Sequence, residues 1–233
     1  MLRKMHYEII LAILSTEYNI QIEQQGMDAV WEIYRNTQHD SHLLDIVATI
    51  AKAFKNAYTL DTYHQLKKTV LTHIDSFHPI EQRFCFGWLT TYFTFVTRYT
   101  KSNKRETDVE YLNLYKAGFQ QKYLLNHKIS APLFISPFMV AGVLGDIEWC
   151  RYMIANYMDC VYDVDKSNVV FFADVYLNFV LENDEKVVEL MQHKTTMSYD
   201  KNSSHQLLKF YLMLSLFRLK RFDELYTLSL IHI

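Results

Sequence analysis

The sequence predicts an all-α fold, and three observations support this prediction. The 233-residue chain has only five glycines and three prolines, whereas average usage is about 7% and about 5%. Sheet and α/β proteins need many tight turns, so this scarcity favours helices joined by few turns. Apolar residues recur with a helical period along most of the chain. One helical pattern is repeated three times between Ser136 and Leu228.

The N-terminal part of the chain reads as a series of amphipathic helices. We expect a first helix that ends near Glu17 and a second that begins after Gly26. Asp40 or Ser41 is suited to cap the next helix, because a short polar side chain accepts a hydrogen bond from the first free amides. After a turn near residues 58–61, another helix is expected to end near Ser76.

Two further helices are expected before residue 126. Pro79 suits the first turn of a helix, where its missing N–H costs nothing, and residues 84–96 after it are apolar nearly all round. The threonines and aromatic residues of this run also have strand propensity. Thr107 and Glu110 then match the capping-box pattern, which predicts a helix that continues to about Leu125.

A boundary is expected between residues 129 and 136, where Ser136 and Pro137 resemble an N-cap and a first helical residue. We therefore predict an N-terminal region, residues 1–130, with about six helices. A C-terminal region, residues 131–233, would hold three helix pairs. The two regions are either separate domains or one continuous solenoid of about 11–12 helices in total.

Each copy of the repeated pattern has a nearly all-apolar leading helix, a tight polar break and an amphipathic trailing helix. Aligning the breaks on Gly145, Asn183 and Lys220 gives intervals of 38 residues (145 to 183) and 37 residues (183 to 220). A single helix pair cannot bury its apolar face, so such pairs are expected to stack on one another.

The breaks resemble those of tetratricopeptide (TPR)-like helical repeats, in which a Leu-Gly-x-aromatic-x-x-Ala turn is typical. The resemblance is clearest in L-G-D-I-E-W-C and L-K-R-F-D-E-L. The sequence departs from the family pattern at the position of the small residue. The interval between its breaks also exceeds the 34 residues of the tetratricopeptide repeat. The resemblance implies a TPR-like α-solenoid of antiparallel helix pairs. The chain also resembles uncharacterised helical-repeat proteins of bacteria, which implies no function. The small-residue position holds Cys150, Val188 and Leu225, and the aromatic position holds Ile147, Glu185 and Phe222.

The last trailing helix runs into the apolar sequence L-Y-T-L-S-L-I-H-I. Solenoids require a terminal unit with a polar outer face. We therefore expect the chain to be a fragment, truncated at its C-terminus, of a longer array.

Charge and hydropathy exclude several classes of partner. A net charge of −2 and an isoelectric point near 6.5 provide no basic surface for nucleic acid or anionic lipid. The longest uncharged runs are shorter than the 18 or more residues that cross a bilayer, so we expect no membrane association. The three cysteines form no C-x-x-C pair, which favours free thiols and a cytoplasmic location.

Candidate chemistry is sparse, and we predict no catalytic residues, no metal site, no cofactor and no enzymatic activity. His39 and His42, with Asp45 one turn later, provide two or three donors but no complete metal set. Asp163 and Asp165 stand at a helix start, where they complement the helix dipole rather than form an acid–base pair. No phosphate-binding, metalloprotease or nucleophile-elbow motif occurs.

The predicted function is a non-enzymatic protein–protein interaction scaffold or adaptor that holds a protein or peptide segment. A small-molecule ligand is not expected. The predicted partner-binding residues lie along successive leading helices: Asp174, Asn178, Lys209 and Arg218. One alternative is a structural or regulatory helical fragment of a larger protein, and another is an enzyme with an unrecognised site.

Overall fold

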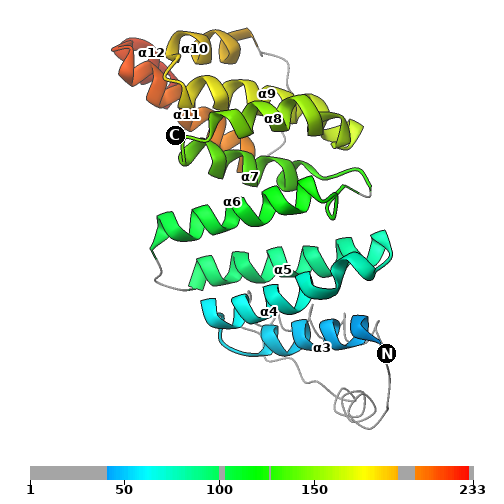
Figure 1. The fold of residues 1–233 in the computed structure, drawn as a ribbon. Coiled ribbons are helices and arrows are strands. Elements are labelled where there is room, and N and C mark those ends of the chain that lie inside the picture. The colour runs from blue at the N-terminus through cyan, green and yellow to red at the C-terminus, as the bar shows by residue number, and fades with distance from the viewer. Residues whose placement is uncertain (1–40, 100–102, 126, 194–202, 231–233) are drawn as a thin grey trace. The chain divides into compact units, whose positions relative to one another are not determined.

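A computed structural model of the chain describes residues 41–99, 103–125, 127–193 and 203–230. These residues form ten α-helices and two short 3-10 helices, and no strand occurs among them (Figure 1). The predicted all-α class is therefore confirmed. The two helices expected before Asp40 lie outside the described residues. The backbone contacts divide the chain into two compact units, Met1–Asn126 and His127–Ile233, which we call unit 1 and unit 2.

Unit 1 is organised around its longest described helix, α5, which packs against three other helices. Apolar and aromatic side chains occupy several sides of this helix, as expected for one with several neighbours. The helices of the unit are α3 (His42–Lys55), α4 (Leu60–His73), α5 (Pro79–Tyr99) and α6 (Lys104–Gln120), with a 3-10 turn at Ile74–Ser76.

Two helix starts in unit 1 lie where the sequence places them. The side chain of Ser41 accepts a hydrogen bond from the backbone N–H of Leu44 at 3.4 Å, so Ser41 caps α3. Pro79 is the first residue of α5, where its ring fixes a helical backbone angle. The strand propensity of the following threonines is overridden because the aromatic residues between them are buried on several sides.

The start of α6 differs from the expected capping box at Thr107 and Glu110. Asn103, which accepts a hydrogen bond from the backbone N–H of Arg105, is the actual cap. Thr107 lies inside the helix and donates its hydroxyl to the backbone of the preceding turn. Glu110 instead accepts hydrogen bonds from the Tyr63 hydroxyl at 2.6 Å and the Lys67 ammonium at 2.7 Å. The capping-box pattern takes account only of residues close in sequence, whereas the carboxylate of Glu110 connects α6 to α4.

Unit 2 contains three consecutive pairs of helices. The leading helices are α7 (Ala131–Val143), α9 (Asp163–Val180) and α11 (Ser203–Arg218), and the trailing helices are α8 (Ile147–Tyr157), α10 (Asp184–His193) and α12 (Phe222–Leu230). The central leading helix, α9, packs against both other leading helices as well as α8 and α10 (Figure 1). Each trailing helix packs against the leading helix of its own pair.

The start of α7 lies earlier than the sequence indicated. The helix begins at Ala131, with Ser130 before it and Pro132 in its first turn, so Pro137 lies inside the helix. Pro137 cannot donate the backbone hydrogen bond of an interior residue. The helix continues because Pro137 is buried and α7 packs against α8 and α9.

The three leading helices end in the same backbone motif. One residue in each turn has a positive φ: Gly145 (77°), Glu182 (57°) and Lys220 (58°). The backbone N–H of the next residue then bonds to a carbonyl five residues earlier, as in a Schellman motif. These bonds join Asp146 to Ala141 at 2.8 Å, Asn183 to Asn178 at 2.9 Å and Arg221 to Leu216 at 2.9 Å.

The residue that completes each Schellman motif also precedes the trailing helix. Asp146, for example, accepts a hydrogen bond from the backbone N–H of Trp149 with its side chain. The equivalent turn positions are therefore Gly145, Glu182 and Lys220, so the expected alignment on Asn183 was wrong by one residue. Asn183 is instead the residue immediately before α10, and its side-chain amide donates a hydrogen bond to the side-chain oxygen of Asn178 at 2.9 Å.

Glycine at the last of these turns is expected to stabilise unit 2. Lys220 has a left-handed backbone that costs a residue with a side chain about 1 kcal/mol. Lys220→Gly should therefore raise the free energy of unfolding by about 0.5–1 kcal/mol, measured by urea denaturation. Lys220→Ala, which removes the charge but keeps the unfavourable φ, is the control and should give no gain. Equal gains in both variants would contradict the backbone explanation.

The packing of α7 against α9 depends on a glycine. A Cβ at Gly142 would lie 2.5 Å from the ring of Tyr176 and 2.6 Å from its hydroxyl oxygen. That hydroxyl donates a hydrogen bond to the carbonyl of Met139 at 2.6 Å. The missing side chain of Gly142 therefore allows a large aromatic residue of α9 to lie directly on α7.

Candidate functional site

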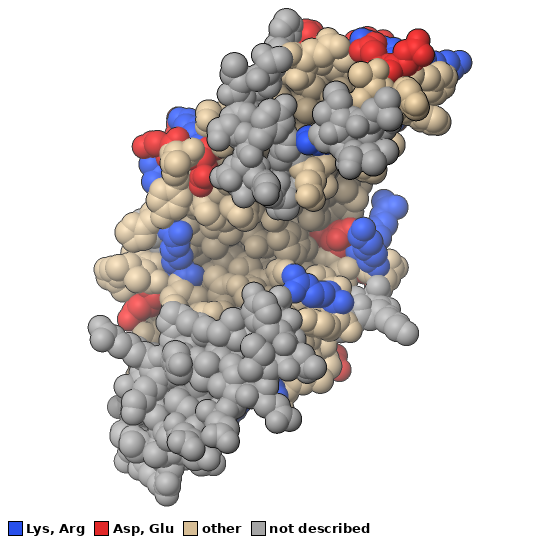
Figure 2. Space-filling view, turned by 180° about the vertical axis from the view of Figure 1, so that it is seen from behind, with Lys and Arg blue, Asp and Glu red and all other residues tan. Residues whose placement is uncertain are grey.

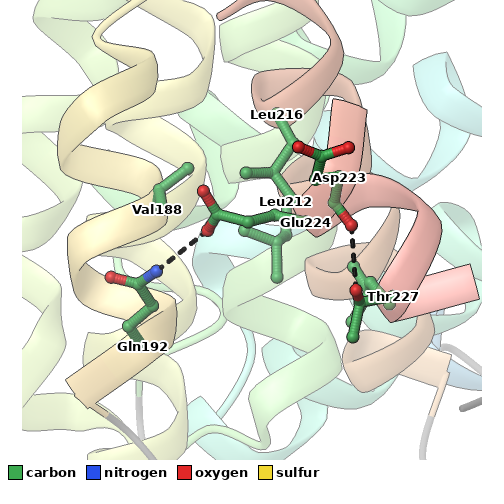
Figure 3. A pocket seen from close by; sticks show the side chains of 8 residues that line it. Val188, Gln192, Leu212, Leu216, Asp223, Glu224 and Thr227 are labelled. Carbon is green, nitrogen blue, oxygen red and sulfur yellow. Dashed lines mark hydrogen bonds between the residues drawn. The ribbon is translucent and has the colours of Figure 1, made fainter. Parts of the chain in front are cut away.

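An open groove of about 360 Å³ lies among α10, α11 and α12, all within unit 2 (Figure 3). Figure 3 shows residues of α10 on one side and residues of α12 on the other, with α11 between them. The residues that line the groove are Val188, Gln192, Leu212, Leu216, Asp223, Glu224, Thr227 and Leu228.

The floor of the groove is apolar. Val188 and Leu216 belong to the core of the unit, and Leu212 and Leu228 complete the apolar lining. Aliphatic side chains that meet water at the base of a groove favour an apolar ligand group, because its burial removes further apolar surface from water.

One of the two acidic side chains at the rim is held by neighbouring residues. Arg221 donates two hydrogen bonds to the carboxylate of Glu224, at 2.5 and 2.6 Å. The side-chain amide of Gln192 donates a third, longer one at 3.4 Å, which connects α10 to α12 (Figure 3). The charge of Glu224 is therefore largely neutralised within the groove wall.

The other acidic side chain, Asp223, is not neutralised in this way. Its backbone carbonyl accepts a hydrogen bond from the Thr227 hydroxyl at 2.9 Å. Its carboxylate receives no hydrogen bond or ion pair from the residues that the structure describes. The groove therefore combines an apolar floor with one carboxylate that no described side chain neutralises.

No known protein family, curated protein or solved structure matches the chain.

The four residues predicted to bind a partner do not line this groove. Asp174 and Asn178 lie on α9, and Lys209 and Arg218 lie on α11. Asn178 accepts the side-chain hydrogen bond of Asn183 and so belongs to the turn between α9 and α10.

Arg218 is the predicted residue with the clearest contacts. Its guanidinium donates to the carboxylate of Asp184 at 3.4 Å and lies 4.6 Å from the centre of the Phe179 ring. Asp184 is nearly buried, with 9% of its side chain exposed. Arg218 therefore holds α11 against the preceding helix pair.

A histidine considered as a metal donor stacks on another ring, and two of the three cysteines are buried. His39 lies outside the described residues, while the ring of His42 stacks on His73 with 4.3 Å between ring centres. Within the described ranges, no group of three or more His, Cys, Asp or Glu side chains could hold a metal ion. Cys85 and Cys150 are buried thiols, and burial raises the pKa of Cys85 to about 12.

Surface charge in the described part is mixed. On the face drawn in Figure 2, acidic and basic side chains adjoin one another in several places. Uncharged surface separates these places. This mixture agrees with the net charge of −2. No helix among the described residues is both long and apolar enough to span a membrane.

Proposed function

We propose that the chain is a non-enzymatic, TPR-like helical-repeat module that binds a short peptide segment of another protein in the groove between α10 and α12. The observation that carries the proposal is the carboxylate of Asp223, which no described side chain neutralises, beside an apolar floor. A binding groove needs both an apolar surface to provide affinity and a polar group to orient the ligand.

The repeated turn supports the assignment to a TPR-like array. The positive-φ residues recur after 37 residues (145 to 182) and 38 residues (182 to 220). Each is followed by the same five-residue backbone hydrogen bond. A repeated connection of this kind gives every helix pair a similar internal geometry, which is the property from which solenoids are built.

The chemistry of the groove defines the expected peptide. One large apolar side chain, such as leucine or phenylalanine, would lie against Leu212 and Leu216. A lysine or arginine beside it would face Asp223. Because Glu224 already has Arg221 as its partner, a single cation is sufficient, and a strongly basic peptide has no advantage.

The test is selection of random peptides of about 12 residues, a length within the reach of a groove ligand, on the immobilised full chain. We expect enrichment of an apolar residue within two positions of lysine or arginine. Thr227→Trp, which fills the groove from its exposed wall, should weaken binding of a selected peptide at least tenfold, about 1.4 kcal/mol. Binding is measured by fluorescence anisotropy.

Charge variants separate the contribution of Asp223 from a general effect of negative charge. Asp223→Asn should weaken binding about twofold to fivefold, because an exposed ion pair contributes about 0.2–1 kcal/mol. Glu185→Gln removes an exposed acid from the equivalent first turn of α10, outside the groove, and should change nothing. Peptides that bind Thr227→Trp as tightly as the original chain would rule out the groove as their site.

A further inference from the structure

The apolar floor of the groove is specific to the third helix pair. Leu212 and Leu216 lie eight residues (212 to 220) and four residues (216 to 220) before Lys220, the positive-φ residue of their turn. In the second pair the same two positions are occupied by Asp174 and Asn178. Leucine at these positions is therefore not a requirement of the repeat, and the apolar floor needs an explanation of its own.

A groove between two successive pairs stays open when the chain continues. Within the described ranges, α10 and α12 do not pack directly against each other, but each packs against α11. At the equivalent place between α8 and α10, Asp174 of α9 is exposed although α11 and α12 follow it in the chain. A helix pair that followed α12 with the same geometry would leave the groove open in the same way.

The size of the groove limits the part of a ligand that it holds. Its volume of about 360 Å³ is near the lower end of the range of about 300–1,000 Å³ found for small-ligand sites. About one or two residues of a polypeptide fit into such a volume. They must supply a large apolar side chain for the floor and one cation for Asp223, whose carboxylate no described side chain neutralises.

An internal peptide segment needs about three residues to meet both requirements, because neighbouring side chains of an extended chain point to opposite sides. An apolar and a basic side chain that enter the same groove therefore stand two residues apart, about 7 Å. The first residue of a polypeptide, by contrast, carries its ammonium group and its side chain on the same carbon atom. One N-terminal residue thus provides both groups within the space of the groove.

We infer that the groove binds the free N-terminus of a partner polypeptide whose first residue is large and aliphatic, such as leucine. Its ammonium group donates to the carboxylate of Asp223, and its side chain lies on Leu212 and Leu216 (Figure 3). Glu224 keeps its ion pair with Arg221. A segment that continued this chain after α12 has no free ammonium group and is not a ligand of this kind. The inference rests on the proposed function and adds which end of the peptide is recognised.

The experiment measures binding of three peptides of about eight residues to the full chain by fluorescence anisotropy, with fluorescein at the C-terminus of each peptide. The first peptide has a free N-terminal leucine followed by glycine and serine. The second is the same peptide with an acetylated N-terminus, and the third is acetylated and has a lysine two positions after the leucine. We expect the first peptide to bind at least tenfold more tightly than the second, because acetylation removes the charge and adds bulk. The third should bind no better than the second.

The pH dependence of binding identifies the ammonium group. An α-amino group has an ordinary pKa of about 7.7–8.0, whereas that of lysine is about 10.4. Affinity for the first peptide should fall about twofold to fourfold from about pH 7 to about pH 9, a range in which carboxylates and guanidinium groups keep their charge. The ionisable side chains at the groove are Asp223 and Glu224, with Arg221 beside the latter. Asp223→Asn should remove most of this dependence, and Glu185→Gln, at the equivalent position of α10, should leave it unchanged.

Two results separate this inference from the proposed function. If the lysine peptide bound as tightly as the first peptide and Thr227→Trp abolished its binding, the groove would hold internal segments. The proposed function would then stand and the inference would fail. If Thr227→Trp left the binding of every peptide unchanged, the groove itself would not be the site.

Two other occupants are tested with the same material. Free leucine carries a carboxylate that would enter a groove lined by two carboxylates, so it should compete at least tenfold more weakly than the unlabelled first peptide. Equal competition would assign the groove to a free amino acid. Concentration-dependent dimerisation in analytical ultracentrifugation, abolished by Thr227→Trp, would place a second copy of this chain there. Either result would overturn the assignment to a partner polypeptide.

Discussion

Gly142→Ala is expected to destabilise unit 2 by about 2–3 kcal/mol, the upper part of the usual cost of inserting a methyl group into a packed core. The new Cβ would lie 2.5 Å from the Tyr176 ring, and Tyr176 cannot move aside without losing its hydrogen bond to Met139. Urea denaturation measures the loss. Hydrogen exchange should show that α7 and α9 lose protection before the helices of unit 1 do.

Two controls separate this clash from the general effect of replacing a glycine in a helix. A Cβ at Gly87 of α5 has no atom within 4 Å, so Gly87→Ala should stabilise by about 0.5–1 kcal/mol because alanine favours the helix. The double variant Gly142→Ala with Tyr176→Leu should be less destabilised than the sum of the two single variants. Additive losses would mean that the two residues are not coupled.

Raising the pH above 10 is expected to unfold the protein progressively. Burial, followed by the hydrogen bond to Glu110, raises the pKa of Tyr63 far above its ordinary value of 10.0. Burial is also the main cause that raises the pKa of Tyr123 and of Tyr157 to about 12. In the unfolded chain these hydroxyls ionise near pH 10. Their stabilising contribution is therefore complete below pH 10 and decreases as the pH rises from 10 towards 12.

The loss from Tyr63 alone is about 1.4 kcal/mol for each pH unit above 10, because one proton more is bound in the folded than in the unfolded state. Several tyrosines with raised pKa values add to this loss, and typical total stabilities are about 5–15 kcal/mol. Chemical denaturation at a series of pH values measures the slope.

Tyr63→Phe provides the specific test of this slope. The variant should lose stability at pH 7, because Glu110 keeps the Lys67 ammonium but loses the Tyr63 hydroxyl. Its decline above pH 10 should nevertheless be shallower by about 1.4 kcal/mol per pH unit. Phe93→Leu, which alters the ring 4.3 Å from Tyr63, should reduce stability without changing the slope. An unchanged slope in Tyr63→Phe would show that Tyr63 ionises in the folded protein.

The sequence was most informative where a structural signal is local. The scarcity of glycine and proline and the helical periodicity predicted the all-α class, and Ser41 and Pro79 marked two helix starts correctly. Local patterns were misleading where distant contacts decide the outcome. Pro137 stays within α7 because the helix is packed against two others, and Glu110 forms contacts with α4 rather than a cap.

The groove was not predictable from the sequence for a similar reason. Asp223 and Glu224 are adjacent acids in the first turn of α12, and that position alone explains both by the helix dipole. Only the three-dimensional contacts show that Arg221 and Gln192 hold Glu224 and that no described side chain does the same for the carboxylate of Asp223. Arg218, predicted to bind a partner, contacts Asp184 across the helix pairs, which the sequence did not indicate.

The shared turn between the helices of each pair restricts where such a chain can change in length. At Asp146 one residue both completes the Schellman motif of α7 and caps α8. One inserted residue there would separate these two roles and turn α8 by about 100° relative to α7. The connection from α8 to α9 is fixed in another way, since it contains a 3-10 turn and its Val161 forms a backbone bridge with Ile129. Insertions and deletions should therefore not be tolerated in the turn within a pair, which makes the helix pair the unit of fixed length in this architecture.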